Sequence, residues 1–296
     1  MSEPIDNKIT DEAVVSLYSG ERFKELIEAG VFFGRKRTKT NPRMRPYILV
    51  TRNEMEIINL EKTLEGLEQA LLFLKEKIRG GGSARSTGSA DSPQGGSLQP
   101  GSGQARQASS PQGGNILLVG TQPQAVEGVV KLAKEFNMPF VTARWLGGLL
   151  TNFKIISKRN DYYKKLKDDL RTGGLEKYTK KERLGFEREI RRLEELFGGL
   201  ENYLALPDAL LMIDPNIHMT AVREAKRLKI PIIAYVNTDI DPDLAEYSVI
   251  GNTKARKSVN WFLEKAAEAM REAKALHSAE PKESVETAEK MNQAAA

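Results

Sequence analysis

Three short and almost entirely apolar runs recur along the chain, and each is followed by a stretch whose apolar residues have helical spacing. The runs cover residues 115–120 (NILLVG), 209–214 (ALLMID) and 231–237 (PIIAYVN). Runs of this kind are typical of parallel strands that helices cover on both faces. Alternating strands and helices also imply right-handed crossovers onto one sheet. We therefore expect an α/β domain with a mainly parallel sheet.

Weaker patterns extend this prediction. Residues Tyr47–Thr51 and Glu56–Leu60 flank Arg52–Asn53 and predict a β-hairpin, and Phe140–Ala143 predicts one further strand. Helices are expected where apolar residues repeat every three or four positions, because this spacing places them on one face. The expected helices cover residues 60–78, 122–136, 221–228 and 259–270.

One region interrupts the alternation of strands and helices. Residues 152–204 contain two long helical patterns and no strand, with Gly173–Gly174 between them. Thr179 and Glu182 form a T-x-x-E capping box, which predicts the start of the second helix. Because apolar residues repeat at spacings of four and three, we expect an antiparallel helical hairpin with a narrow seam, projecting from the sheet.

Two segments are too polar to join a core. Of the 36 residues in 79–114, 26 are Gly, Ser, Gln or Pro, so this segment is expected to be a disordered insert. Residues 277–296 lack a continuous apolar face and are expected to be a disordered tail. The predicted organisation is an N-terminal segment (1–20), an α/β domain in three parts (21–78, 115–151 and 205–276), the insert (79–114), the helical hairpin (152–204) and the tail (277–296).

Composition excludes several classes of protein. The chain has no cysteine and only two histidines, His218 and His277, which excludes disulfide scaffolds, cysteine-ligated metal centres and histidine-rich metal sites. No apolar run reaches the ~18 residues that a membrane helix needs. The acidic N-terminus is unlike a secretory signal, so cytoplasm is the expected compartment. No catalytic signature stands out, and we predict no catalytic residue, metal or cofactor.

The charge of the chain is most uneven at residues 35–52. This segment carries seven Lys and Arg residues and no acid, whereas the whole chain has a formal net charge of only +5. The turn signal Asn41–Pro42 places the segment on a loop. Seven like charges repel unless an anion lies opposite, and Lys and Arg side chains neutralise phosphates. The pattern favours nucleic acid as the partner, with a solvated basic loop as the alternative.

Other candidate sites have plain structural interpretations as well. In residues 144–152 (RWLGGLLTN), Arg144 and Trp145 could grip a phosphate and a sugar or base, or the Trp could pack at a strand end. The acids of 237–243 (NTDIDPD) could bind Mg²⁺, but the pattern is more typical of an acidic turn. The turn at 120–123 is a weak phosphate signal, and His218 is expected to be a polar surface residue. The hairpin is basic, with Tyr162–Tyr163 as a stacking surface, or is simply a charged arm.

Together these motifs resemble the bacterial-type family of small-subunit ribosomal protein S2. The resemblance covers about residues 12–275 apart from the insert, and its most specific motif is RWLGGLLTN at 144–152. It implies a flavodoxin-like three-layer α/β domain with a protruding antiparallel helical hairpin. It also implies a structural role in binding 16S-type rRNA and in recruiting the largest small-subunit protein. The other matching motifs, in family order, are 29–34 (AGVFFG), 41–47 (NPRMRPY), 56–60 (EIINL), 62–63 (KT), 118–121 (LVGT), 207–208 (PD), 213–214 (ID), 224–225 (EA) and 230–231 (IP).

The chain departs from the family pattern at four places. The family's HFGH reads FFGR at 32–35, so both histidines of that motif are absent. Its DTN reads NTD at 237–239, and its PGNDD reads IGNTK at 250–254. The insert stands where the family has a short Gly-containing connection. The net change is toward positive charge, which favours retained RNA binding.

These observations predict a non-enzymatic, cytoplasmic ribosomal protein. Its expected partners are small-subunit rRNA of the 16S type and neighbouring small-subunit proteins, the largest one being a candidate, with no membrane and no small-molecule substrate. The alternatives are a nucleotide- or flavin-binding α/β enzyme that uses the strand ends at Gly120 and Asp239, and a free RNA-binding regulator. The residues predicted to contact RNA are Arg35, Lys36, Arg37, Lys39, Asn41, Arg43, Arg45, Arg144, Trp145, Asn152, Lys154, Lys158, Arg159, Lys254 and Arg256.

Overall fold

A five-stranded sheet forms the centre of the molecule, and every neighbouring pair of its strands is parallel, as the apolar runs predict. The computed structural model describes residues 20–80 and 114–279 of the 296-residue chain. The strand order is β5-β4-β6-β7-β8. The strands are β4 (Ile116–Val119), β5 (Phe140–Val141), β6 (Ala209–Ile213), β7 (Ile232–Val236) and β8 (Tyr247–Ile250).

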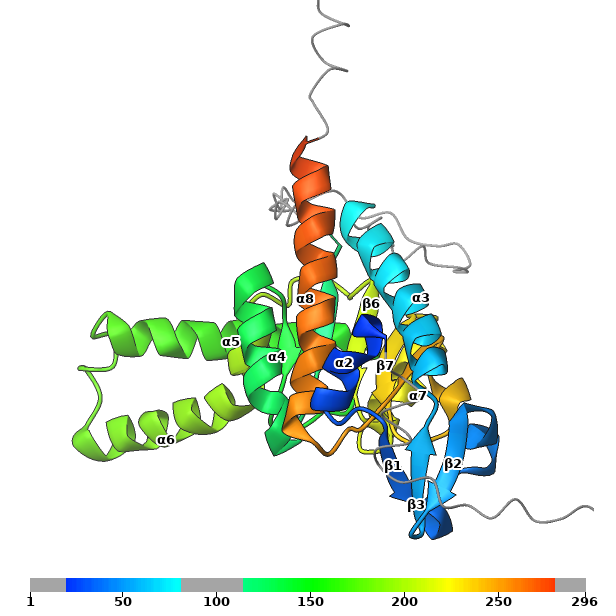
Figure 1. Cartoon of the computed structure of the whole chain (residues 1–296). Coiled ribbons are helices and arrows are strands. Elements are labelled where there is room, and N and C mark those ends of the chain that lie inside the picture. The colour runs from blue at the N-terminus through cyan, green and yellow to red at the C-terminus, as the bar shows by residue number, and fades with distance from the viewer. Residues whose placement is uncertain (1–19, 81–113, 280–296) are drawn as a thin grey trace, which may run out of the picture.

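Helices cover both faces of this sheet, which gives the domain three layers (Figure 1). Leu118 of β4 packs in one core with residues of four helices, and its neighbour Leu117 packs in a second core on the other face. Because successive side chains of a strand point to opposite faces, the inner strands β4, β6 and β7 serve both cores and are buried throughout. The helices are α2 (Glu21–Glu28), α3 (Leu60–Arg79), α4 (Pro123–Phe136) and α8 (Arg256–Ala279) on the first face, and α7 (Met219–Leu228) on the second.

A second, antiparallel sheet of order β1-β3-β2 lies beside the carboxyl end of the main sheet (Figure 1). Strands β2 (Ile48–Arg52) and β3 (Met55–Ile58) are the predicted β-hairpin, and both turn residues, Asn53 and Glu54, have positive φ, as in a type I′ turn. Strand β1 (Phe33–Lys36) and helix α2 (Glu21–Glu28) were not predicted, nor was β8. The two missed strands have four residues each, and a Gly or Ser interrupts their apolar pattern.

The predicted helical hairpin is present as α5 (Phe153–Arg171) and α6 (Lys180–Phe197), which project from the main sheet as an antiparallel arm (Figure 1). The capping box that begins α6 is formed as expected, because the Thr179 and Glu182 side chains each accept from the other's backbone amide. Buried residues line the seam of the arm and continue into the second core. They are Ile156, Tyr163, Leu166, Ile190 and Phe197.

Most of the predicted insert and tail lies outside the described residues, as does the N-terminal segment. Helix α8 continues to Ala279, three residues into the stretch expected to be a tail. Gly114 lies directly against the backbone carbonyl of Lys77 near the end of α3, so the two described ends of the insert are neighbours. No helix within 20–80 or 114–279 combines the length and the apolar character that crossing a bilayer requires.

Deletion of residues 83–112 is therefore expected to leave the midpoint of thermal unfolding nearly unchanged. The short connection that remains still spans neighbouring ends, and a shorter loop costs less closure entropy. Differential scanning calorimetry of the full chain and the deletion variant measures this. A loss of more than about 5 °C would show that the insert supports the fold.

Candidate nucleic-acid interface

The basic loop (residues 35–45) lies across the carboxyl end of β7. Its first residue and its middle are tied to one residue there, because the Arg35 amide donates to Thr238 Oγ1 and the Asn41 amide donates to the Thr238 carbonyl, both at 2.8 Å. A Cβ on Gly34 would lie within 3 Å of the Thr238 side chain, so a glycine is needed at this approach. The loop is thus fixed at the edge where open α/β sheets bind their ligands.

One short helical turn, Arg37–Lys39, lies between these two contacts, and a second, Pro42–Tyr47, follows them. Asn41 caps the turn Pro42–Tyr47 by accepting from the Arg43 amide at 3.0 Å. Met44 is fully buried in the second core and anchors the same turn. The Arg37 amide donates to the Glu54 carbonyl at 2.7 Å, which holds the loop against the β2–β3 turn. The cations of the loop are therefore carried on an ordered backbone.

The acidic turn (residues 237–243) faces this loop. Arg35 Nε lies 3.1 Å from Asp239 Oδ2. Arg43 Nη1 lies 2.7 Å from Asp241 Oδ2 and 3.0 Å from Asp243 Oδ2. The three acids therefore form ion pairs with arginines, as expected of an acidic turn and not of a Mg²⁺ site. They neutralise part of the positive charge of residues 35–52, a segment that contains no acid of its own.

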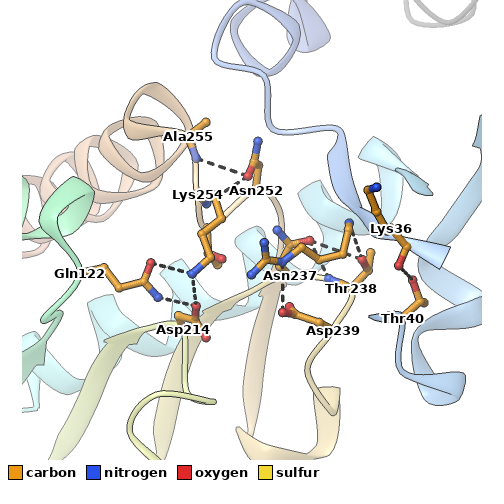
Figure 2. Close-up of polar contacts among 12 residues, drawn as sticks. Lys36, Thr40, Gln122, Asp214, Asn237, Thr238, Asp239, Asn252, Lys254 and Ala255 are labelled. Carbon is orange, nitrogen blue, oxygen red and sulfur yellow. Dashed lines mark hydrogen bonds and ion pairs between the residues drawn. The ribbon is translucent and has the colours of Figure 1, made fainter. Parts of the chain in front are cut away.

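Lys254 and Arg256, two further predicted RNA contacts, also form ion pairs within the protein. Figure 2 shows Lys254 reaching across the carboxyl ends of the strands, where its Nζ lies 3.3 Å from Asp214 Oδ2 and 3.1 Å from Gln122 Oε1. Asp214 is buried, so Lys254 supplies its charge partner. Arg256 forms an ion pair with Glu127 on α4. Lys254 in the loop after β8 and Arg256 at the start of α8 are therefore both paired with acids in the folded protein.

His218 corrects an expectation from the sequence. It is 3% exposed and is therefore a buried residue, not one on the surface. Burial lowers the pKa of its imidazole, although the nearby Asp214 carboxylate acts to raise it. Its Nε2 lies 3.5 Å from Thr121 Oγ1, which places it beneath the β4 and β6 carboxyl ends.

The turn at residues 144–152 is built around one carboxylate. Glu224 of α7 accepts from the amides of Gly148, Leu150 and Thr151 at 2.8, 3.1 and 3.1 Å. It also accepts from Trp145 Nε1 and from Thr151 Oγ1, each at 3.1 Å. Burial acts to raise the pKa of this carboxyl, but these hydrogen bonds outweigh it and hold the pKa below its usual range.

This arrangement decides how the residues of the turn are presented. Trp145 is 8% exposed and bonded to Glu224, so its ring packs in the core and is not available for stacking on a sugar or base. This agrees with the second interpretation of the motif, in which the Trp packs at a strand end. Arg144 and Asn152 are exposed at the two ends of the turn. The sequence singled out Glu224 only as part of the matching motif at 224–225, with no sign of its bonds to this turn.

The arm presents further cations beside this turn. Lys154, Lys158 and Arg159 are exposed on the first turns of α5. Tyr162 is 46% exposed, whereas Tyr163 is fully buried in the seam, so only one of the two tyrosines offers a stacking surface. Burial also raises the pKa of the Tyr163 hydroxyl. The base of the arm therefore contributes exposed cations, and Tyr162 adds an accessible ring near them.

The candidate residues thus divide into two groups. Arg35, Arg43, Lys254 and Arg256 are held in ion pairs. Lys36 lies 3.9 Å from Glu54, and both side chains are mostly exposed. No ion pair occurs within residues 20–80 and 114–279 for the exposed cations that remain, which are Arg37, Lys39, Arg45, Arg144, Lys154, Lys158 and Arg159.

Comparison of the sequence with known proteins identifies the family to which this fold and its basic surface belong. A family model described as ribosomal protein S2 matches residues 26–90 and 104–273. The chain belongs to the ribosomal protein S2 family. Small ribosomal subunit protein uS2 from each of two strains of Thermus thermophilus is 36% identical over 251 residues. Those residues are 85% of this chain and 86% of each relative.

The S2 match covers nearly all elements that form the interface. It includes the basic loop, the turn at 144–152, the arm and the acidic turn. The gap in the match, residues 91–103, falls inside the Gly/Ser/Gln-rich segment. The resemblance first noted in the motifs is thereby confirmed over the α/β domain and its arm.

Proposed function

We propose that this S2-family protein is a structural constituent of the small ribosomal subunit and binds its rRNA through phosphate contacts. The observation that carries the proposal is the basic loop, which an ordered backbone fixes at the carboxyl edge of the sheet. Arg37, Lys39 and Arg45 are exposed there and lie outside every ion pair of the described chain. The name of the Thermus relatives, a small ribosomal subunit protein, supports the same assignment.

The mechanism we propose is electrostatic positioning. Folded rRNA presents mainly backbone and shape to a protein, because its deep major groove hides base edges from side chains. Contacts from Lys and Arg to phosphates position a protein without reading sequence. The α/β domain would hold the loop, the turn at 144–152 and the base of the arm in fixed relation. Neighbouring small-subunit proteins, the largest one included, are the further partners we propose, and the ribosome in the cytoplasm is its location.

The enzyme alternative is less well supported. Doubly wound sheets bind nucleotides at the switch point of strand order, which lies here between β4 and β6. The side chains of Gln122, Asp214 and Lys254 bond to one another across that position. Membership of a ribosomal protein family also implies a structural, non-enzymatic role.

The proposal predicts a steep salt dependence of binding. The association constant of the full chain for small subunits depleted of this protein should fall linearly with salt on a double-logarithmic plot. The triple variant Arg37→Ala, Lys39→Ala, Arg45→Ala should make the slope shallower by about two to three units, since each phosphate contact contributes about 0.7–0.9. Titration at five or more salt concentrations measures this.

A matched control removes charge from the opposite end of the domain. Lys134 is exposed in the last turn of α4, which starts at the carboxyl edge and so ends away from it. Lys134→Ala should leave the slope unchanged. A wild-type slope near zero would contradict phosphate neutralisation altogether.

A further inference from the structure

The basic loop and the acidic turn meet at Arg43 in an unusual balance of charge. One guanidinium nitrogen of Arg43 is shared by two carboxylates, those of Asp241 and Asp243. These three side chains carry one positive and two negative charges, so Arg43 is fully matched by acids, and the next cation is Lys226, whose Nζ lies 2.8 Å from the Asp243 carbonyl. Arg35 is matched one to one by Asp239. A phosphate that approaches either arginine meets carboxylates already in contact with it.

The acidic turn is braced through its backbone and through the carboxylate of Asp241. The Asp243 amide donates to Asp241 Oδ1 at 3.1 Å, which caps the short turn Pro242–Leu244. Lys226 Nζ donates to the Asp243 carbonyl at 2.8 Å. Ser248 Oγ donates to the Pro242 carbonyl at 2.7 Å. The turn is held from α7 and from β8, and it presents both acids to the loop.

From this geometry we infer that the acidic turn masks Arg35 and Arg43 from rRNA, and that Arg37, Lys39 and Arg45 make the phosphate contacts of the basic loop. The inference rests on the proposed function and names the residues of that site. If Arg43 left Asp241 and Asp243 to pair with a phosphate, two unpaired carboxylates would face the RNA. Their negative charges would repel the nearby phosphates. The acidic turn thereby determines which cations of the basic loop contact rRNA.

The two groups of arginine respond differently to truncation. A cation already neutralised by protein releases no counterion from RNA, so its loss does not alter the salt slope. Arg43→Ala should weaken binding, because it leaves two carboxylates uncompensated, but it should change the slope of binding to depleted small subunits by less than the value of about 0.7–0.9 for one phosphate contact. Arg37→Ala removes the same charge from the same loop and should make the slope shallower by about 0.7–0.9.

Removing the charges of Asp241 and Asp243 should have the opposite effect on the salt slope, and combining it with Arg43→Ala completes a mutant cycle. Asp241→Asn with Asp243→Asn unmasks Arg43 and should steepen the slope by about 0.7–0.9. Adding Arg43→Ala to this double variant should return the slope to the wild-type value. Both acids are partly or largely exposed and Asn keeps the shape of Asp, so the fold should persist. Thermal unfolding of each variant checks this.

The outcomes separate the inference from the function on which it rests. An Arg43→Ala slope as shallow as that of Arg37→Ala would overturn masking, and so would a double Asn variant with the wild-type slope. Either result would leave the proposed rRNA binding intact, because the wild-type slope would still be steep. A wild-type slope near zero would overturn the proposed function itself.

Discussion

Replacement of Glu224 by alanine is expected to lower the free energy of unfolding by about 3 kcal/mol and to free the turn at 144–152. The change leaves five donors without their acceptor, three of them backbone amides. A buried donor left without a partner costs about 1–3 kcal/mol, and neighbouring losses are not additive. Chemical denaturation measured by circular dichroism gives the free energy, and hydrogen exchange at 146–152 reports the turn.

Two comparisons sharpen this test. Glu195 is exposed on α6, and Glu195→Ala should cost less than about 0.5 kcal/mol. The pKa of Glu224 is lowered in the folded protein, so its stabilisation is present above the unfolded pKa of about 4.5 and is lost as pH falls through the lower folded value. The difference between wild type and Glu224→Ala should therefore shrink below about pH 4. An undiminished difference there would show that the charge of Glu224 is not what holds the turn.

Replacement of Gly251 by alanine is expected to destabilise the fold by about 3 kcal/mol, at the upper end for overpacking a core. A Cβ at this position would overlap the Tyr235 hydroxyl and lie 2.6 Å from Cζ of the ring. Tyr235 cannot move aside, because its ring stacks on Phe262 at 4.8 Å and its hydroxyl bonds Ser258 Oγ at 2.5 Å. Denaturant titration of the variant measures the loss.

Gly147 provides the matched control for this substitution. It lies in the turn at 144–152, and a Cβ there would have nothing within 4 Å. Gly147→Ala should therefore be nearly neutral or slightly stabilising, since it only restricts the unfolded chain. Equal effects at the two glycines would show that contact with Tyr235 is not the cause.

Most of the fold could be predicted from local sequence patterns. Strands β4, β6 and β7 are buried on both faces, so their apolar runs are continuous and easily read. The arm was predicted with its capping box because seam and cap are both set by residues close in sequence. Strands β1 (FGRK) and β8 (YSVI) were missed because Gly and polar residues break up their short sequences, whereas β4, also of four residues, is apolar throughout.

The candidate site was predicted less completely, because its electrostatics depend on distant residues. The basic loop and the acidic turn were each recognised, but Arg43 and Asp241 are 198 residues apart and their pairing comes from the fold. The same holds for Glu224 and the turn that it organises, which are separated by about 75 residues. His218 was misjudged because a side chain at a helix start gives no local sign of burial, whereas for Trp145 the sequence left packing and RNA contact both open.

The central claim, assembly into the small ribosomal subunit, is tested most directly by sucrose-gradient cosedimentation. Full-length chain would be mixed at low salt with small subunits depleted of this protein, and fractions would be probed for both components. The account predicts that the chain travels with the small subunit and is released to the top of the gradient as salt is raised. A chain that stays at the top at low salt, while the depleted subunits remain intact, would contradict it.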